Sequence, residues 1–151
     1  MKLDKADCND LQAILELQIL AYQSEADLFG SRDIPPLRQT LDEVIEEYNT
    51  GIILKMLDDS GEIIGSVRAK EIDGTVYIGK LMVHPKQRCK GYGSKLLLEI
   101  EKYFPNKRYE LFTSTRSNDN IRLYQKMGYT IFKHEIINNE LQFVYLEKYK
   151  I

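Results

Sequence analysis

The chain has 151 residues, of which 43% are hydrophobic and 29% charged, and its formal net charge is −2 at pH 7. This size and composition suit one globular domain, and we expect a single domain over residues 1–151. A net charge so near zero gives no reason to expect binding to nucleic acid or to an acidic membrane surface. No apolar run approaches the ~20 residues of a membrane span, and the first ten residues are charged where a signal peptide would be apolar. We therefore expect a cytoplasmic protein.

The chain contains two cysteines, Cys8 and Cys89, and two histidines. Their positions fit neither a disulfide framework nor the ligand spacing of a metal site. We expect no structural metal.

Two helices are expected in the first fifty residues. Apolar residues at helical spacing predict a helix over residues 7–22 with Asp7 as its N-cap. Thr40 to Glu43 forms a capping box that opens a second helix, and Gly51 stands where a C-terminal cap belongs. The polar stretch between them, residues 23–39, contains one glycine and two prolines, so it is predicted to be a loop long enough to serve as a lid or substrate wall.

The rest of the chain alternates strands with two helices. Asp73-Gly74 is a strong hairpin signal between two of the strands. Helices are predicted from Gly91 to Phe104 and from Ser117 to Met127, and the first of them implies a parallel strand pair around it. The predicted strands cover residues 52–57, 63–71, 75–83, 109–115, 129–136 and 141–148. This order predicts a mixed, mostly antiparallel α/β (α+β) fold in which about four helices flank one sheet.

Residues 77–98, YIGKLMVHPKQRCKGYGSKLLL, join a strand to a helix through a basic loop that contains glycine. A helix N-terminus offers unpaired N–H groups to an anion, and Gly91 and Gly93 let a phosphate approach the backbone. A Walker loop does not fit, because Gly93 is followed by Ser94-Lys95 rather than by lysine and a hydroxyl residue. A dinucleotide fingerprint fits poorly, because Leu96 stands where its third glycine belongs.

Two motifs carry a resemblance to a known family. Arg88-x-x-Gly91-x-Gly93 resembles the acyl-coenzyme A binding motif of the GNAT N-acetyltransferase superfamily. Residues 117–129, SNDNIRLYQKMGY, resemble the second signature of the same family, a helix that ends in Leu-Tyr-x-Lys-x-Gly-Phe/Tyr. The two motifs follow the family's order and spacing, and the resemblance covers the chain from about Ile63 onward. It implies a fold in which two strands splay apart to admit acetyl-CoA as the acyl-donor cosubstrate.

The resemblance also implies roles for individual residues. The loop backbone would hold the pyrophosphate, its basic side chains would pair with phosphates, and the main chain of the preceding strand would bind pantetheine. Cys89 stands where the family often has glycine; it is taken as a tolerated small side chain, and its reactivity is left open. The cofactor-binding candidates are Leu81, Val83, Arg88, Cys89, Lys90, Gly91, Tyr92, Gly93, Ser94 and Asn120.

Catalytic candidates follow from the same resemblance. The family's tyrosine protonates the departing thiolate, and Tyr124 stands at that position. A phenol with a pKa of ~10 can donate its proton to a thiolate whose thiol has a pKa of ~8.5. Family members often carry a glutamate early on the strand before the motif, but Tyr77 stands there, so Glu71 is our candidate base and Glu25 the second. Ser117 is either an N-cap or a pantetheine contact.

Three functions remain open at this point. The leading one is an acetyl-CoA-dependent N-acetyltransferase that moves an acetyl group to a primary amine of a small molecule or peptide in a ternary complex. Acidic residues such as Glu25 in residues 23–39 would suit a cationic amine. A non-catalytic acyl-CoA sensor is the second, and a nucleotide-phosphate domain using the same loop is the third. A homodimer is also left open, because the final hairpin of such folds can pair across subunits.

Overall fold

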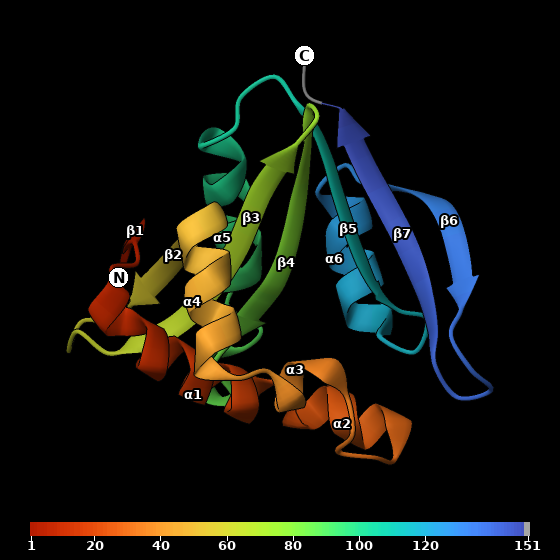
Figure 1. Cartoon of the computed structure of the whole chain (residues 1–151), viewed down its shortest axis with the longest axis horizontal. Helices are drawn as coiled ribbons and strands as arrows, with labels where there is room; N and C mark the ends of the chain where they lie inside the picture. The colour runs from red at the N-terminus through yellow and green to blue at the C-terminus, as the bar shows by residue number, and fades with distance from the viewer. Residues whose placement is uncertain (150–151) are drawn as a thin grey trace.

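The centre of the computed structural model is a seven-stranded sheet in the order β1-β2-β3-β4-β5-β7-β6 (Figure 1). The structure describes residues 1–149, so residues 150–151 of the expected domain lie outside the described residues. Neighbouring strands pair antiparallel except β4 and β5, which run parallel. The mixed, mostly antiparallel sheet is therefore confirmed. The strands are β1 (Lys2–Lys5), β2 (Ile52–Leu57), β3 (Ile63–Ile72), β4 (Thr75–Val83), β5 (Arg108–Ser114), β6 (Thr130–Ile136) and β7 (Gln142–Tyr149).

Helices cover both faces of the sheet. α1 and α4 lie in front of β2–β4 in Figure 1, whereas α5 lies behind these strands and α6 lies beside β5 on the same side as α5. The α-helical segments are α1 (Leu11–Ala21), α2 (Gln23–Phe29), α3 (Pro35–Arg38), α4 (Leu41–Thr50), α5 (Tyr92–Lys102) and α6 (Asn118–Lys126). Short 3-10 turns, Cys8–Asp10 and Pro85–Gln87, precede α1 and follow β4.

Two apolar layers hold the helices to the sheet. The larger layer joins the sheet to α5 and α6 and includes Leu96, Ile100 and Tyr124. On the other face, Ile14 of α1 and Val44 of α4 are buried against β2. Helices therefore cover both faces of the middle of β2–β4, where most of the buried strand residues lie.

Local sequence signals explain several element ends. In the predicted capping box, the Thr40 side chain accepts a hydrogen bond from the Glu43 N–H, and the Glu43 carboxylate accepts one from the Thr40 N–H. Asp73 and Gly74 have φ of 50° and 84°, as expected for the predicted hairpin between β3 and β4. Both predictions are confirmed.

The structure differs from the sequence prediction at two places. Residues 23–39, predicted to be a loop, contain the short helices α2 and α3. Gly30, with φ of 72°, ends α2, and Pro35 begins α3, because proline suits the first turn of a helix. The loop prediction was wrong because we read these residues only as breakers. The short edge strand β1, which pairs with β2, was not predicted.

The sheet opens between its two parallel strands. β4 pairs with β5 only from Thr75 to Tyr77, opposite Arg108 to Glu110, although both strands continue beyond these pairs. The two ribbons diverge from that point in Figure 1. A bulge in β4 lies just beyond, because Arg68 of β3 faces Gly79 whereas Ser66 faces Met82, leaving an extra residue in β4. The splayed pair is therefore confirmed.

Candidate active site

The loop from β4 to α5 lies at the open end of the splayed strands. Gly91, the residue before α5, has φ of 81°, and a Cβ placed on it would meet no atom within 4 Å. Cys89 also has a positive φ, of 63°. No side chain caps α5, so the first-turn N–H groups, which include those of Tyr92 and Ser94, have no side-chain acceptor within residues 1–149. This backbone fits an anionic group that needs close approach to main-chain donors.

Gly93 has a packing role that the sequence did not reveal. A Cβ on Gly93 would lie 3.3 Å from Cδ2 of Leu123, so the glycine lets α5 approach α6 closely. This contact places the two motif helices side by side. The prediction that Gly93 also lets a phosphate approach is not tested by this contact.

The basic side chains of the loop have protein partners. The Arg88 guanidinium donates to the Ala21 carbonyl oxygen at 2.7 Å and to Ser24 Oγ at 3.1 Å. It thereby joins the loop to the junction of α1 and α2. Lys90 Nζ donates to Gln87 Oε1 at 2.9 Å. The pairing of Arg88 and Lys90 with phosphates stays a prediction.

The β4 backbone beyond Tyr77 is free of β5. Leu81 and Val83 lie on this stretch, and their side chains pack against the apolar layer beneath α5. Their main chain faces the opening on the side that β5 has left. This edge can hold an extended chain that carries amide groups, as a strand holds its neighbour.

Tyr124 of α6 is buried beneath this opening, with 6% of its surface exposed. Within residues 1–149, its hydroxyl has no hydrogen-bond partner, whereas Tyr129, whose ring centroid lies 6.2 Å away, donates to Glu101. Burial raises the pKa of Tyr124, and the neighbouring Tyr22 and Glu25 raise it further. The phenol is therefore neutral and has a proton to donate to a bound group.

Glu25 of α2 lies against the second motif. Its carboxylate accepts hydrogen bonds from Ser117 Oγ at 2.6 Å and from Asn120 Nδ2 at 3.1 Å. Ser117 occupies the predicted N-cap position of α6, but its hydroxyl donates to Glu25 and makes no side-chain cap. These contacts join segments more than 90 residues apart and place an acid beside Tyr124.

Glu71, our first candidate for the base, lies apart from this cluster. Its carboxylate pairs with Lys107 Nζ at 3.2 Å, at the end of β3 where β4 still pairs with β5. Glu71 faces Val76, and four residues along β4 separate that position from the bulge, about 13 Å at ~3.3 Å per residue. The structure does not bring Glu71 together with Tyr124 and Glu25.

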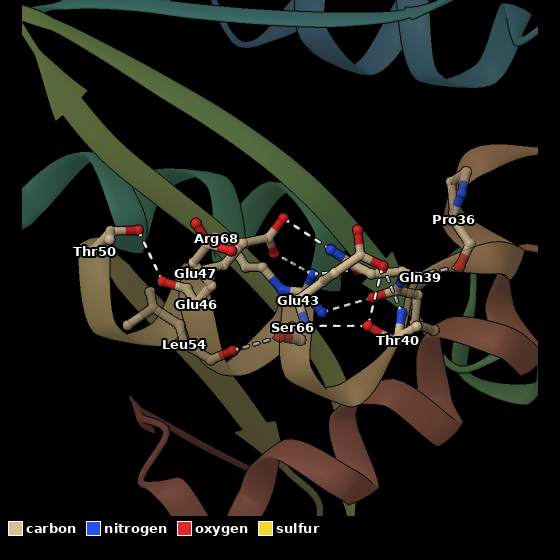
Figure 2. Close-up of polar contacts among 11 residues, drawn as sticks. Pro36, Gln39, Thr40, Glu43, Glu46, Glu47, Thr50, Leu54, Ser66 and Arg68 are labelled. Carbon is tan, nitrogen blue, oxygen red and sulfur yellow. Dashed lines mark hydrogen bonds and ion pairs between the residues drawn. The ribbon is translucent and has the colours of Figure 1, made fainter.

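A buried polar network supports the opposite face of β4, and the sequence analysis missed it. The Arg68 guanidinium, 5% exposed, donates to Glu47 Oε2 at 2.6 Å, to Gln39 Oε1 at 3.0 Å and to Gln18 Oε1 at 2.6 Å. Figure 2 shows Arg68 reaching Gln39 and Glu47 beneath α4. Arg68 and Lys80 are charged residues flanked by apolar residues within their strands, a sequence signal that would have marked both.

Tyr22, the residue that ends α1, lies near both this network and Glu25. Burial raises the pKa of Tyr22, Glu25 and Glu47 raise it further, and Arg68 opposes them. Tyr22 therefore lies near charged groups of both the Arg68 network and α2. No sequence motif marked Tyr22, because its position depends on how α1 packs on the sheet.

The described part of the chain gives no sign of a metal site or membrane helix. Among residues 1–149, no group of three or more His, Cys, Asp or Glu side chains could hold a metal ion. Within the same residues, no helix is both long and apolar enough to cross a membrane.

The opened sheet and the loop at its mouth fit an extended ligand that carries phosphate at one end. The chain matches the model of the acetyltransferase (GNAT) family over residues 11–129, and it belongs to that family. The family assignment made from the two motifs is confirmed.

Solved structures share the whole fold. Smu.2055 from Streptococcus mutans UA159 aligns with a TM-score of 0.83 at 14% identity, covering 99% of both chains. The PaiA N-acetyltransferase from Thermoplasma acidophilum, in complex with coenzyme A, gives a TM-score of 0.78 at 20% identity over 98% of both chains. A GNAT superfamily phosphinothricin acetyltransferase from Sinorhizobium meliloti, in complex with AcCoA, gives 0.77 at 17% identity, covering 99% of this chain and 88% of that chain. No curated protein sequence matches the chain.

Proposed function

We propose that this protein is an acetyl-CoA-dependent N-acetyltransferase that moves an acetyl group to a primary amine of a small molecule or peptide. The observation that carries the proposal is the end of β4–β5 pairing at Tyr77, which opens the sheet toward the uncapped N-terminus of α5. Family membership and the coenzyme complexes of PaiA and the phosphinothricin acetyltransferase support it.

The residues around the opening fit the coenzyme. The first turn of α5 and the open space over Gly91 would hold the pyrophosphate, and the free edge of β4 at Leu81 and Val83 would hold the pantetheine amides. Arg88 and Lys90 belong to the loop between β4 and α5 and would supply positive charge to the phosphates. The coenzyme supplies an acyl group activated as a thioester.

Transfer then needs an amine nucleophile on the other side of the opening. The amine nitrogen attacks the thioester carbonyl carbon, the carbon–sulfur bond breaks, and the amine loses a proton. The Val83 N–H would stabilise negative charge on the carbonyl oxygen. Because its pKa is raised, Tyr124 would stay protonated and donate a hydrogen bond to the departing sulfur.

Glu25 takes the place of Glu71 in this proposal. Ser117 and Asn120 occupy only part of the hydrogen-bonding capacity of the Glu25 carboxylate, which has about four lone-pair sites. It lies beside Tyr124, and it would bind the acceptor ammonium group and receive its proton. Glu71 pairs with Lys107 at the closed end of the strands, so it is given no catalytic role.

Calorimetry on the loop tests coenzyme binding. Acetyl-CoA, coenzyme A and ATP are titrated into the wild type and into Gly91→Trp, whose indole would fill the open space over the loop. Gly74→Trp is the matched control, because Gly74 has φ of 84° and equally open surroundings but lies in the hairpin at the far end of β4. We expect the two coenzyme forms to bind the wild type and the control, and neither to bind Gly91→Trp.

A turnover assay then separates the enzyme from a non-catalytic sensor. Release of coenzyme A thiol over a panel of amines identifies a transferase, whereas binding without release with any amine identifies a sensor. ATP that competes with coenzyme A would instead favour the nucleotide alternative. No coenzyme binding by the folded wild type would refute the proposal.

Location and assembly stay predictions. The cytoplasmic location rests on the sequence alone. The homodimer has one structural indication, because the Phe112 ring, which is 51% exposed, packs against the rings of Phe143 and Tyr145 on the β5–β7 face.

A further inference from the structure

Gly79 leaves a hollow in the middle of β4. Neither the backbone conformation nor close packing requires a glycine at this position. Its φ lies outside the left-handed range, and a Cβ placed on it would meet no atom within 4 Å. Paired residues of adjacent strands point to the same face, and Gly79 faces Arg68, whose side chain reaches α1 and α4. The hollow therefore lies on the α1 and α4 face. A glycine inside a strand often marks the approach of a ligand.

Lys80 follows directly and forms the bulge. Its φ of 52° is a left-handed conformation that lysine rarely adopts, and such strain is retained mainly at functional sites. The side chain is half-buried, and within residues 1–149 Nζ has no hydrogen-bond or ion-pair partner. Burial lowers the pKa of Lys80, nearby Arg68 lowers it further, and Glu47 and Glu43 oppose them. The amine is thus partly desolvated without a bonded partner to compensate.

Neither nearby acid bonds to Lys80 within residues 1–149. Glu47 Oε2 accepts from Arg68 and Oε1 accepts from Gln39, and Glu43 Oε1 accepts from the N–H and the hydroxyl of Thr40. Arg68 in turn uses both of its terminal nitrogens in the network, and its buried Nε has no partner within residues 1–149. Lys80 is therefore the cation of this cluster whose whole charged group is available to an anion from outside the protein.

Lys80 lies on the face of the opening from which the acceptor would enter. Gly79 and Lys80 follow one residue after the last pair between β4 and β5, where the sheet begins to open. They face α1 and α4, whereas the loop and α5 approach the opening from the opposite face. Glu25 and the Arg68 network both influence the pKa of Tyr22, so both lie near that phenol. The acceptor side thus has an acid, Glu25, and an unpaired cation, Lys80, beside the Arg68 network.

We propose that the hollow over Gly79 takes a carboxylate of the acceptor, paired with Lys80, so that the acceptor is an amino acid with its amine directed to Glu25. This inference rests on the proposed function and narrows its substrate class. The opposite charges of Glu25 and Lys80 match those of a zwitterion, and a simple amine would leave Lys80 unpaired.

Matched acceptor pairs test the proposal. At saturating acetyl-CoA, kcat/KM is measured for L-amino acids, for the corresponding amino acid amides and for the corresponding decarboxylated amines. We expect kcat/KM to be roughly tenfold to a hundredfold higher for the free acids than for the amides and amines. This is the ratio that one hydrogen bond between charged groups contributes. Lys80→Met should abolish this preference, mainly through KM, whereas Lys80→Arg should retain it. Gly79→Val should raise KM for the acids without loss of coenzyme binding.

Controls separate this inference from the proposed function. Lys70→Met removes an exposed lysine of β3 and should leave the preference unchanged. Each variant is first checked for coenzyme binding by calorimetry, which reports that it is folded. Amides or amines that react as well as acids in the wild type, or a Lys80→Met variant that slows all acceptors equally, would overturn the inference while leaving the transferase intact. Absence of turnover with every acceptor would remove the proposed function and this inference with it.

Discussion

Replacing Tyr124 with phenylalanine removes one hydroxyl from the centre of the site. Because that hydroxyl has no hydrogen-bond partner within residues 1–149, its loss leaves no protein group unpaired, and the free energy of unfolding should change little. In the proposed reaction the same hydroxyl bonds to a sulfur that gains negative charge. A hydrogen bond to a charged group contributes about 1.5–3 kcal/mol, which corresponds to a decrease in kcat of roughly 10- to 150-fold.

The assay is thiol release at saturating acetyl-CoA, with coenzyme affinity measured separately by calorimetry. Tyr129→Phe is the matched control, because it removes the neighbouring hydroxyl, which donates to Glu101 at 2.8 Å and faces the interior behind α5. The control should lose stability and keep its turnover per folded molecule. An unchanged kcat in Tyr124→Phe would refute the role of Tyr124, and an equal loss in both variants would show only a packing effect.

Two further predictions concern stability. The Glu101 carboxylate is fully buried and accepts hydrogen bonds from Lys148 Nζ at 3.0 Å and from the Tyr129 hydroxyl. Glu101→Gln should therefore lower the free energy of unfolding, measured by urea titration, by about 3 kcal/mol. A loss below about 1 kcal/mol would contradict this. Burial raises the pKa of Tyr22, Tyr124 and Tyr129 above the value of about 10 in the unfolded chain. Their contribution to stability is therefore complete below pH ~10 and is lost as the pH rises through the folded-state values, so the urea midpoint should fall above pH ~10. Ultraviolet absorption of tyrosinate at each pH checks this, and ionisation of these three phenols near pH 10 in the folded protein would contradict it.

Most elements of the fold could be predicted because their signals are local. The Thr40 capping box and the Asp73-Gly74 hairpin act over a few residues, and both appear in the structure as expected. Residues 23–39 were misread because a glycine and two prolines can either interrupt helices or mark their ends. Without a contact to distinguish these cases, local sequence favours neither.

The site was predictable only in part. The loop around Gly91 was found because its glycine spacing and its place between strand and helix are sequence properties. Gly93, by contrast, packs against Leu123, a contact that its spacing did not indicate. Glu25 was named as an acid in a polar stretch, but its partners could not be named. For Ser117 a helix cap and a pantetheine contact were both considered, but its bond to a side chain 92 positions away was not predicted.

The sequence by itself determined the class of the protein, because hydrophobic period, turn residues and two short motifs specify which elements form and in what order. The tertiary structure alone decided which charges meet. It brought Glu25 to α6, left Glu71 at the closed end of the sheet with Lys107, and placed Lys80 unpaired beside the hollow over Gly79. The physical reason is that hydrogen bonds and ion pairs act over a few ångströms in space. Which side chains come within that range depends on strand register, a single bulge and the packing of α1 and α2, none of which is encoded in any one stretch of the chain.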